Sequence, residues 1–250
     1  MPLAPRVIVC LDVRSGRVVK GRKFQDLKDQ GKPADRAAYY EEQGADEIVL
    51  LDVSATRQKR LALAKTVRHV ASALRIPLTV GGGIRSVADA ETLFQNGADK
   101  VSLNTAAVEN PALVRRLADV FGSQSVVVAM DAKRQGQGWE VFTRAGTRPT
   151  EWDAVEWAEK AEALGAGELL VTSIDRDGTR EGFDTALLAA VKQTVRVPVV
   201  ASGGAGKLKD FQEALQAADA VLAAGVFHTG ALSVQKVKQY LKRNGVVVRT

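Results

Sequence analysis

Two glycine-rich turns constrain this chain more than any other feature of its sequence. Gly81-Gly82-Gly83 and Gly203-Gly204 each end a short apolar run that begins after a proline, and each leads into a helical pattern. A glycine turn between a strand and a helix exposes backbone N–H groups, which favour a bound phosphate together with the helix dipole. Gly82 and Gly203 are 121 positions apart, so the pattern predicts two phosphate-binding turns in a duplicated scaffold.

The rest of the sequence repeats with nearly the same shift. Asp12 aligns with Asp131, and Gly44-Ala45 aligns with Gly165-Ala166. Apolar runs alternate with helical spacing eight times, which predicts parallel strands with right-handed crossovers. A (β/α)8 TIM barrel needs about 250 residues. We therefore expect one domain over residues 1–250, built from half-barrels at about 1–122 and 123–250, with a doubly wound open sheet as the alternative.

Composition limits the class of protein and of partner. The 35 Lys and Arg residues are interspersed with 29 Asp and Glu, and no basic run has interleaved aromatics, so the net charge of +6 favours an anionic small molecule over nucleic acid. No apolar run approaches the ~20 residues of a membrane span. The single cysteine, Cys10, excludes an internal disulfide and a Cys-rich zinc site. These features predict a cytoplasmic protein with no membrane partner, and the chain gives no pattern for a metal or cofactor.

Asp12 and Asp131 are the candidate catalytic residues. Each ends an apolar run, and side-chain alternation along a strand places Asp12 on the same face as Cys10 and Arg6. Two carboxylates at a barrel mouth can divide acid and base roles when their environments separate their pKa values. The alternative is that each carboxylate caps a following turn.

Small polar residues at the same strand ends are candidates for binding the two phosphates. Ser102 and Ser202 lie near the turns, and Lys20 lies in a long polar loop, Ser15 to Lys32, as a solvated charge or a ligand contact. Cys10 is expected to pack, His69 to be on the surface, and His228 is ambiguous. The candidates are Gly83, Asn104 and Thr105 for one phosphate, and Asp177, Gly178, Gly204, Ala224 and Gly225 for the other.

Four charged residues stand at the starts of strands, at the opposite end of the barrel. Alternation aims Arg6, Lys100 and Glu168 inward. Glu47 and Asp52 are five positions apart, so both cannot face inward without a bulge. The four charges can form an ion-pair plug, but buried charges seldom maximise stability, which favours a functional ring.

Several motifs resemble the cyclase subunit of imidazole glycerol phosphate synthase, from histidine biosynthesis. The resemblance runs from about residue 3 to residue 250. It is carried by the opening strand with the Gly-Arg-Val-Val-Lys-Gly stretch, by both glycine turns, and by Asp175-Arg176-Asp177-Gly178-Thr179 and the Asn104–Pro111 segment. One departure is Gly225, where such cyclases often carry a serine, so a hydroxyl donor is lost.

The resemblance implies a reaction and a partner. Ammonia would condense with the ketone of a bisphosphorylated formimino-aminoimidazole carboxamide ribonucleotide, and the products would be imidazole glycerol phosphate and the aminoimidazole carboxamide ribotide. Asp12 would be the general base, Asp131 the general acid, and Lys20 part of a closing loop. The four charges at the strand starts would gate ammonia arriving from a docked glutaminase subunit, with Asp99 and Arg249 near that interface. Two alternatives stay open: the sister isomerase of the preceding step, and a non-catalytic phosphate-binding barrel.

Overall fold

Eight parallel strands with helices between them form the framework of the chain. The computed structural model describes residues 4–22, 25–53 and 60–249. The parallel strands follow one another in the order β1, β4, β5, β6, β7, β10, β11 and β12, and β10 also pairs with β7, which is the topology of a (β/α)8 barrel. The predicted fold class is therefore confirmed.

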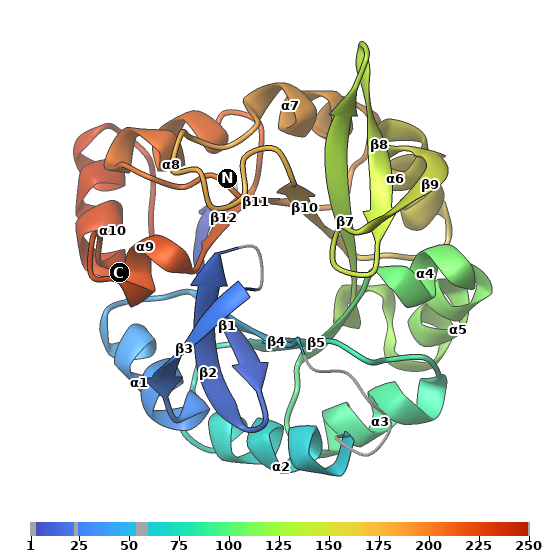
Figure 1. The fold of residues 1–250 in the computed structure, drawn as a ribbon, viewed down its shortest axis with the longest axis horizontal. Coiled ribbons are helices and arrows are strands. Elements are labelled where there is room, and N and C mark those ends of the chain that lie inside the picture. The colour runs from blue at the N-terminus through green and yellow to red at the C-terminus, as the bar shows by residue number, and fades with distance from the viewer. Residues whose placement is uncertain (1–3, 23–24, 54–59, 250) are drawn as a thin grey trace. The chain divides into compact units, whose positions relative to one another are not determined.

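The chain divides into two compact units, Met1–Ser102 with Ala223–Thr250 and Leu103–Leu222. The half-barrel boundary near residue 122 stays a prediction from the sequence repeat. Figure 1 labels the elements along the chain.

The first unit contains a four-stranded parallel sheet in the order β1, β4, β5, β6. Residues Val7 to Leu11 of β1 are buried without interruption, as expected for a sheet that is covered on both faces. The strands are β1 (Arg6–Arg14), β2 (Arg17–Arg22), β3 (Gln25–Gly31), β4 (Glu47–Asp52), β5 (Leu78–Gly81) and β6 (Lys100–Leu103). The helices are α1 (Pro33–Glu42), α2 (Arg60–Ala71), α3 (Val87–Gln95), α9 (Gly225–His228) and α10 (Val234–Arg243).

The second unit repeats this plan with β7, β10, β11 and β12 as its parallel strands. The strands are β7 (Val126–Gln135), β8 (Gly138–Thr143), β9 (Arg148–Asp153), β10 (Glu168–Ser173), β11 (Val199–Ser202) and β12 (Ala220–Ala223). The helices are α4 (Thr105–Glu109), α5 (Ala112–Phe121), α6 (Ala154–Ala163), α7 (Thr185–Thr194) and α8 (Leu208–Ala214), with a 3-10 turn, η2 (Ser123–Ser125), before β7.

An antiparallel hairpin follows the first strand of each unit. The segment predicted as a polar loop, Ser15 to Lys32, instead contains β2 and β3, with β2 paired to β1. Ser15 and Gly16 both have positive φ (52° and 75°), the conformation that lets a two-residue turn join twisted strands. The hairpin was missed because its polar residues lack the alternation of a half-buried strand. In the second unit β8 pairs antiparallel with β7 and with β9, and it lies beside β7 (Figure 1).

Three aspartates fix the starts of parallel strands to their neighbours. Asp46, Asp99 and Asp219 each precede a strand, and each accepts a 2.8 Å hydrogen bond from a backbone N–H at the start of the neighbouring parallel strand. The same aspartates donate their own backbone N–H to the carbonyl of that residue. This reciprocal pair sets the register of adjacent strands. Among the described residues, no helix is both long and apolar enough to span a membrane.

Candidate functional site

Asp131 lies within β7, and its carboxyl group interacts with two other residues of the second unit, Asn104 and Asp177. The strand continues past Asp131 to Gln135 because β8 pairs with it there. The amide of Asn104 donates a 2.9 Å hydrogen bond to Oδ2 of Asp131. Burial raises the pKa of Asp131 to about 6, the negative charge of Asp177 adds to this rise, and the Asn104 hydrogen bond opposes it. A carboxyl group with a pKa near 6 stays partly protonated as the pH approaches neutrality, which suits it to act as a general acid.

Asp12 occupies the equivalent place in β1 of the first unit. It pairs in register with Leu51 of β4, and its side chain is partly exposed between the buried residues Leu11 and Val13. The thiol of Cys10, two positions earlier, lies 3.8 Å from Oδ1 of Asp12. The strand alternation therefore places Cys10 and Asp12 on one face, as the sequence predicts.

The first glycine turn joins β5 to α3. Gly82 and Gly83 have φ of 101° and 72°, and a Cβ on Gly82 would overlap the carbonyl oxygen of Asp52. Ser86 caps α3 by accepting from the backbone N–H of Asp89, whose carboxylate accepts in turn from Arg85 N at 2.9 Å. Only glycine fits the backbone approach at this turn, and Asp89 holds its C-terminal end in place.

The second glycine turn joins β11 to α8 and has the same construction. Gly204 has a φ of 106°, and a Cβ there would overlap the carbonyl oxygen of Gly182, whose N–H donates to Gly204 O at 2.8 Å. The buried carboxylate of Asp210 accepts from the backbone N–H groups of Gly206 and Lys207 at 2.9 and 2.8 Å. Hydrogen bonds with Gly182 and with Asp210 therefore hold the two ends of the turn in place.

Asp210 is a site residue that sequence reasoning missed. Asp89 and Asp210 are 121 positions apart, the shift of the glycine turns themselves, and each stands three residues after a helix N-cap. An acidic residue at this third position is the sequence signature of a reciprocally capped helix start. The repeat and this signature together could have identified it.

The other predicted phosphate contacts are placed as follows. Asp177 and Gly178 follow β10 in the second unit, and a Cβ on Gly203 would lie 3.5 Å from the Cα of Asp177. Ser202 ends β11 in register with Thr172, while the buried Ser102 pairs with Gly81 in the first unit. Ala224 lies between β12 and α9 as the N-cap of that helix, and Gly225 is the first residue of α9.

Asn104 and Thr105 have partners that the sequence did not indicate. Strand β6 ends at Leu103, and α4 begins at Thr105, so Asn104 lies between the two elements. Thr105 Oγ1 accepts from the backbone N–H of Arg144 at 2.9 Å, which leaves its own O–H available as a donor. Asn104 contacts Asp131, as described above. Lys20 lies on β2 opposite Lys28, and its side chain falls outside the described part of the chain.

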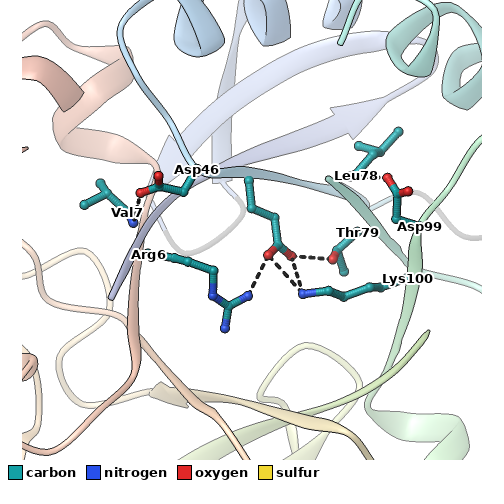
Figure 2. A network of polar contacts seen from close by, with 8 residues as sticks. Arg6, Val7, Asp46, Leu78, Thr79, Asp99 and Lys100 are labelled. Carbon is teal, nitrogen blue, oxygen red and sulfur yellow. Dashed lines mark hydrogen bonds and ion pairs between the residues drawn. The ribbon is translucent and has the colours of Figure 1, made fainter. Parts of the chain in front are cut away.

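Charged residues at the strand starts of the first unit form one buried cluster. Glu47 accepts from Arg6 at 2.7 Å and from Lys100 at 3.0 and 3.2 Å, and its side chain is 3% exposed (Figure 2). The hydroxyl of Thr79 donates to the same carboxylate at 2.6 Å. Glu47, rather than Asp52, is thus the carboxylate of β4 that turns toward Arg6 and Lys100. Glu168, the fourth predicted member, is buried at the start of β10 in the second unit.

The two predicted interface residues are fixed by backbone bonds. Asp99 accepts from Leu78 N, as do its counterparts at other strand starts (Figure 2). The carbonyl of Arg249 accepts from Lys238 Nζ at 3.0 Å, and the same ammonium group pairs with Asp46 at 2.7 Å. The C-terminal segment is therefore attached to α10 beside a strand start.

Comparison with known proteins places the chain in a family. A family model described as "Histidine biosynthesis protein" matches residues 6–233. The chain is 57% identical over 247 residues to a protein of Metallosphaera sedula, 54% over 249 to one of Dehalococcoides mccartyi and 51% over 248 to one of Pyrococcus furiosus. Each alignment covers 98–99% of this chain and of the relative, and each relative is named imidazole glycerol phosphate synthase subunit HisF. The chain therefore belongs to the family of HisF subunits of imidazole glycerol phosphate synthase.

Proposed function

We propose that this chain is the cyclase subunit of imidazole glycerol phosphate synthase. In the proposed reaction, ammonia and the bisphosphorylated formimino-aminoimidazole carboxamide ribonucleotide give imidazole glycerol phosphate and the aminoimidazole carboxamide ribotide. The observation that carries the proposal is the Asp131 carboxyl, which accepts a hydrogen bond from the Asn104 amide and whose pKa desolvation raises to about 6. A simple phosphate-binding protein would have no use for such a group.

The two aspartates divide the proton transfers of this reaction. Asp131 donates a proton to the ketone oxygen of the substrate, which takes a second proton from the condensing ammonia and leaves as water. Asp12 accepts the proton that the attacking nitrogen releases, and it serves as the base in ring closure. Each transfer of this kind contributes roughly 10²–10⁴ in rate.

The two glycine turns bind the terminal phosphates of the substrate. Backbone N–H groups of Gly83 and Gly204 donate to the phosphate oxygens, and the side chains of Ser102, Thr105 and Ser202 supply hydroxyl donors. The remaining N–H donors are those of Gly178, Ala224 and Gly225, since the N–H of the neighbouring Asp177 already donates to the Ser173 carbonyl at 2.9 Å. Lys20, on the β2–β3 hairpin, neutralises phosphate charge when this hairpin covers the substrate.

Ammonia reaches the site from a glutaminase subunit docked at the strand starts. The proposed gate consists of Arg6, Glu47, Lys100 and Glu168, and Asp99 and Arg249 contact the partner. Support comes from the Glu47 carboxylate, which two cations and one hydroxyl hold in a buried position. A buried ion cluster is a costly way to gain stability, which favours a functional role for these charges. An enclosed route keeps ammonia from being protonated in bulk water.

One assay tests the proposal. Purified protein is incubated with the bisphosphate substrate and an ammonium salt at alkaline pH, and the consumption of substrate is followed by absorbance. We expect turnover that depends on ammonia, loss of most activity in Asp12→Asn and Asp131→Asn, and unchanged substrate affinity in both variants. Isomerisation of the preceding intermediate without ammonia would replace this function by that of the sister isomerase, and binding without turnover would remove catalysis altogether.

A further inference from the structure

A chain of hydrogen bonds connects helix α1 to strand β1 through a histidine. The guanidinium of Arg36 donates to the hydroxyl of Tyr40, one helical turn later. That hydroxyl lies 2.7 Å from Nδ1 of His228, the last residue of α9. The other ring nitrogen, Nε2, lies 3.0 Å from the backbone carbonyl oxygen of Cys10 in β1. Residues from three separate elements of the first unit therefore meet in one connected path.

With a neutral imidazole, the hydrogen-bond donors in this path have only one direction. A carbonyl oxygen accepts hydrogen bonds and never donates, so Nε2 of His228 must carry a hydrogen. In the neutral ring Nδ1 is then an acceptor, and the Tyr40 O–H must donate to it. The Tyr40 oxygen is left to accept from Arg36, as the contact requires. The neutral imidazole is thus the Nε2–H tautomer. Each group in the path then donates to the next one, from Arg36 through Tyr40 and His228 to the carbonyl of Cys10 in β1.

The path is held rigidly by its surroundings. Tyr40 is 1% exposed, and burial raises the pKa of its hydroxyl, so this group stays a donor across the working range of pH. The Arg36 guanidinium lies 4.8 Å from the centroid of the Tyr40 ring, in cation–π geometry. The centroid of the Phe227 ring, on α9, lies 6.4 Å from the centroid of the Tyr40 ring. These contacts restrict the rotamers of both aromatic side chains.

Cys10 connects the path to the candidate general base. Its carbonyl accepts from His228, and its thiol lies 3.8 Å from Oδ1 of Asp12, within the range of a weak S–H donor. Displacement of the β1 backbone at Cys10 would therefore move both the thiol and the carboxylate two residues later. Misplacing a catalytic group by about 1 Å can cost roughly 10²-fold in rate.

We propose that His228 is a positioning residue for the reaction, acting through the Cys10 carbonyl to fix the carboxylate of Asp12. This inference rests on the proposed function, in which Asp12 is the general base. It gives a use to a histidine and a buried tyrosine that the acid–base chemistry itself does not need. It also predicts that the Nε2 donor matters for turnover more than the ring as a whole does.

Two amide substitutions separate the two ends of the imidazole. In His228→Gln the side-chain amide can reach the position of Nε2 and donate to the Cys10 carbonyl. In His228→Asn the shorter amide can meet Tyr40 at the position of Nδ1 but cannot reach β1. With ammonium as the nitrogen source, we expect the Gln variant to keep kcat within about threefold of wild type. We expect the Asn variant to lose roughly 10–100-fold in kcat, with KM changed less than threefold.

Three further measurements separate positioning from general damage. The Tm of both amide variants should fall by similar amounts, since each loses one hydrogen bond and the ring. On the Asp12→Asn background, His228→Asn should change residual kcat by less than about twofold, because a residue that acts through Asp12 has nothing left to position. Tyr40→Phe should reduce kcat, while the matched change Tyr39→Phe at the half-exposed neighbouring ring should not.

The outcomes distinguish this inference from the function on which it rests. Wild-type protein without ammonia-dependent turnover would overturn the proposed function and the positioning role together. Wild-type turnover with equal kcat in the Gln and Asn variants would overturn the positioning role alone. A full loss by His228→Asn on the Asp12→Asn background would also overturn it, since the histidine would then act elsewhere.

Discussion

Replacing Asp131 by asparagine should stabilise the folded protein while it removes activity. Burial raises the pKa of this carboxyl to about 6 from 3.8, so the folded state holds the proton more tightly than the unfolded state does. Ionisation then favours unfolding. This destabilisation by the ionised Asp131 begins as the pH rises through about 4 and is complete above about pH 6. It is absent below the pKa that the carboxyl has in the unfolded state. An asparagine has no charge to bury, so the variant should escape this cost.

The gain in stability expected for Asp131→Asn follows from the pKa shift of Asp131. A difference of about 2 pKa units corresponds to about 3 kcal/mol at 1.36 kcal/mol per unit, which is the upper limit for the gain at pH 8. For a protein of about this length, 1 kcal/mol changes Tm by roughly 2–4 °C, so the limit is about 6–12 °C. At pH 4 the unfolded-state carboxyl is only partly ionised, so the gain should fall to about 0.5 kcal/mol.

Thermal unfolding followed by circular dichroism at pH 4 and pH 8 measures this difference. Asp119→Asn is the matched control, because Asp119 is an exposed carboxylate on α5 and the same change there should leave Tm within about 1 °C at both pH values. A variant Asp131→Asn that is no more stable than wild type at pH 8 would refute the reasoning. An equal gain at both pH values would also refute it, because the gain would not come from ionisation.

Three other perturbations have definite expectations. Asp177→Asn should lower the pKa of Asp131 in a carbon-13 NMR titration, because the Asp177 charge contributes to its rise; an unchanged titration would contradict this. Lys100→Ala should reduce glutamine-dependent turnover with the partner subunit more than turnover with added ammonium, and equal effects would return the Glu47 cluster to a structural role. Gly204→Ala should lower stability by more than about 2 kcal/mol in urea unfolding and weaken inorganic phosphate binding, because its Cβ would overlap Gly182 at a positive φ; wild-type affinity would argue against a phosphate at this turn.

The parallel framework could be predicted because its signals are local. Runs of Val, Ile and Leu that end in glycine or aspartate mark buried strands, such as β4, which ends at Asp52, and β5, which ends at Gly81. The glycine turns could be located for the same reason, since the backbone conformation at Gly82 and Gly204 excludes other residues. The position of Asp131 within its strand followed from the repeat.

The parts that were missed depend on residues far apart in the sequence. Alternation could not decide between Glu47 and Asp52, because the choice depends on cations 41 and 53 positions away. The partner of His228 is 188 positions distant, so nothing near it in the sequence indicates a role. The pKa of Asp131 depends on its burial, which three-dimensional packing alone determines.

The aspartates at the strand starts affect how a subunit interface can be dissected by mutation. One carboxylate oxygen of Asp99 accepts a hydrogen bond from the backbone N–H of Leu78, the first residue of β5. Removing the Asp99 side chain would therefore destabilise this strand start and, at the same time, weaken any contact that Asp99 makes with another protein. An alanine scan at this position would mix two losses and overstate the binding energy. Asparagine is the better replacement, because its carbonyl oxygen can still receive the amide hydrogen while its negative charge is gone. Comparing the alanine and asparagine variants would separate the contribution of the Asp99 charge to subunit binding from its contribution to the stability of the β5 strand start.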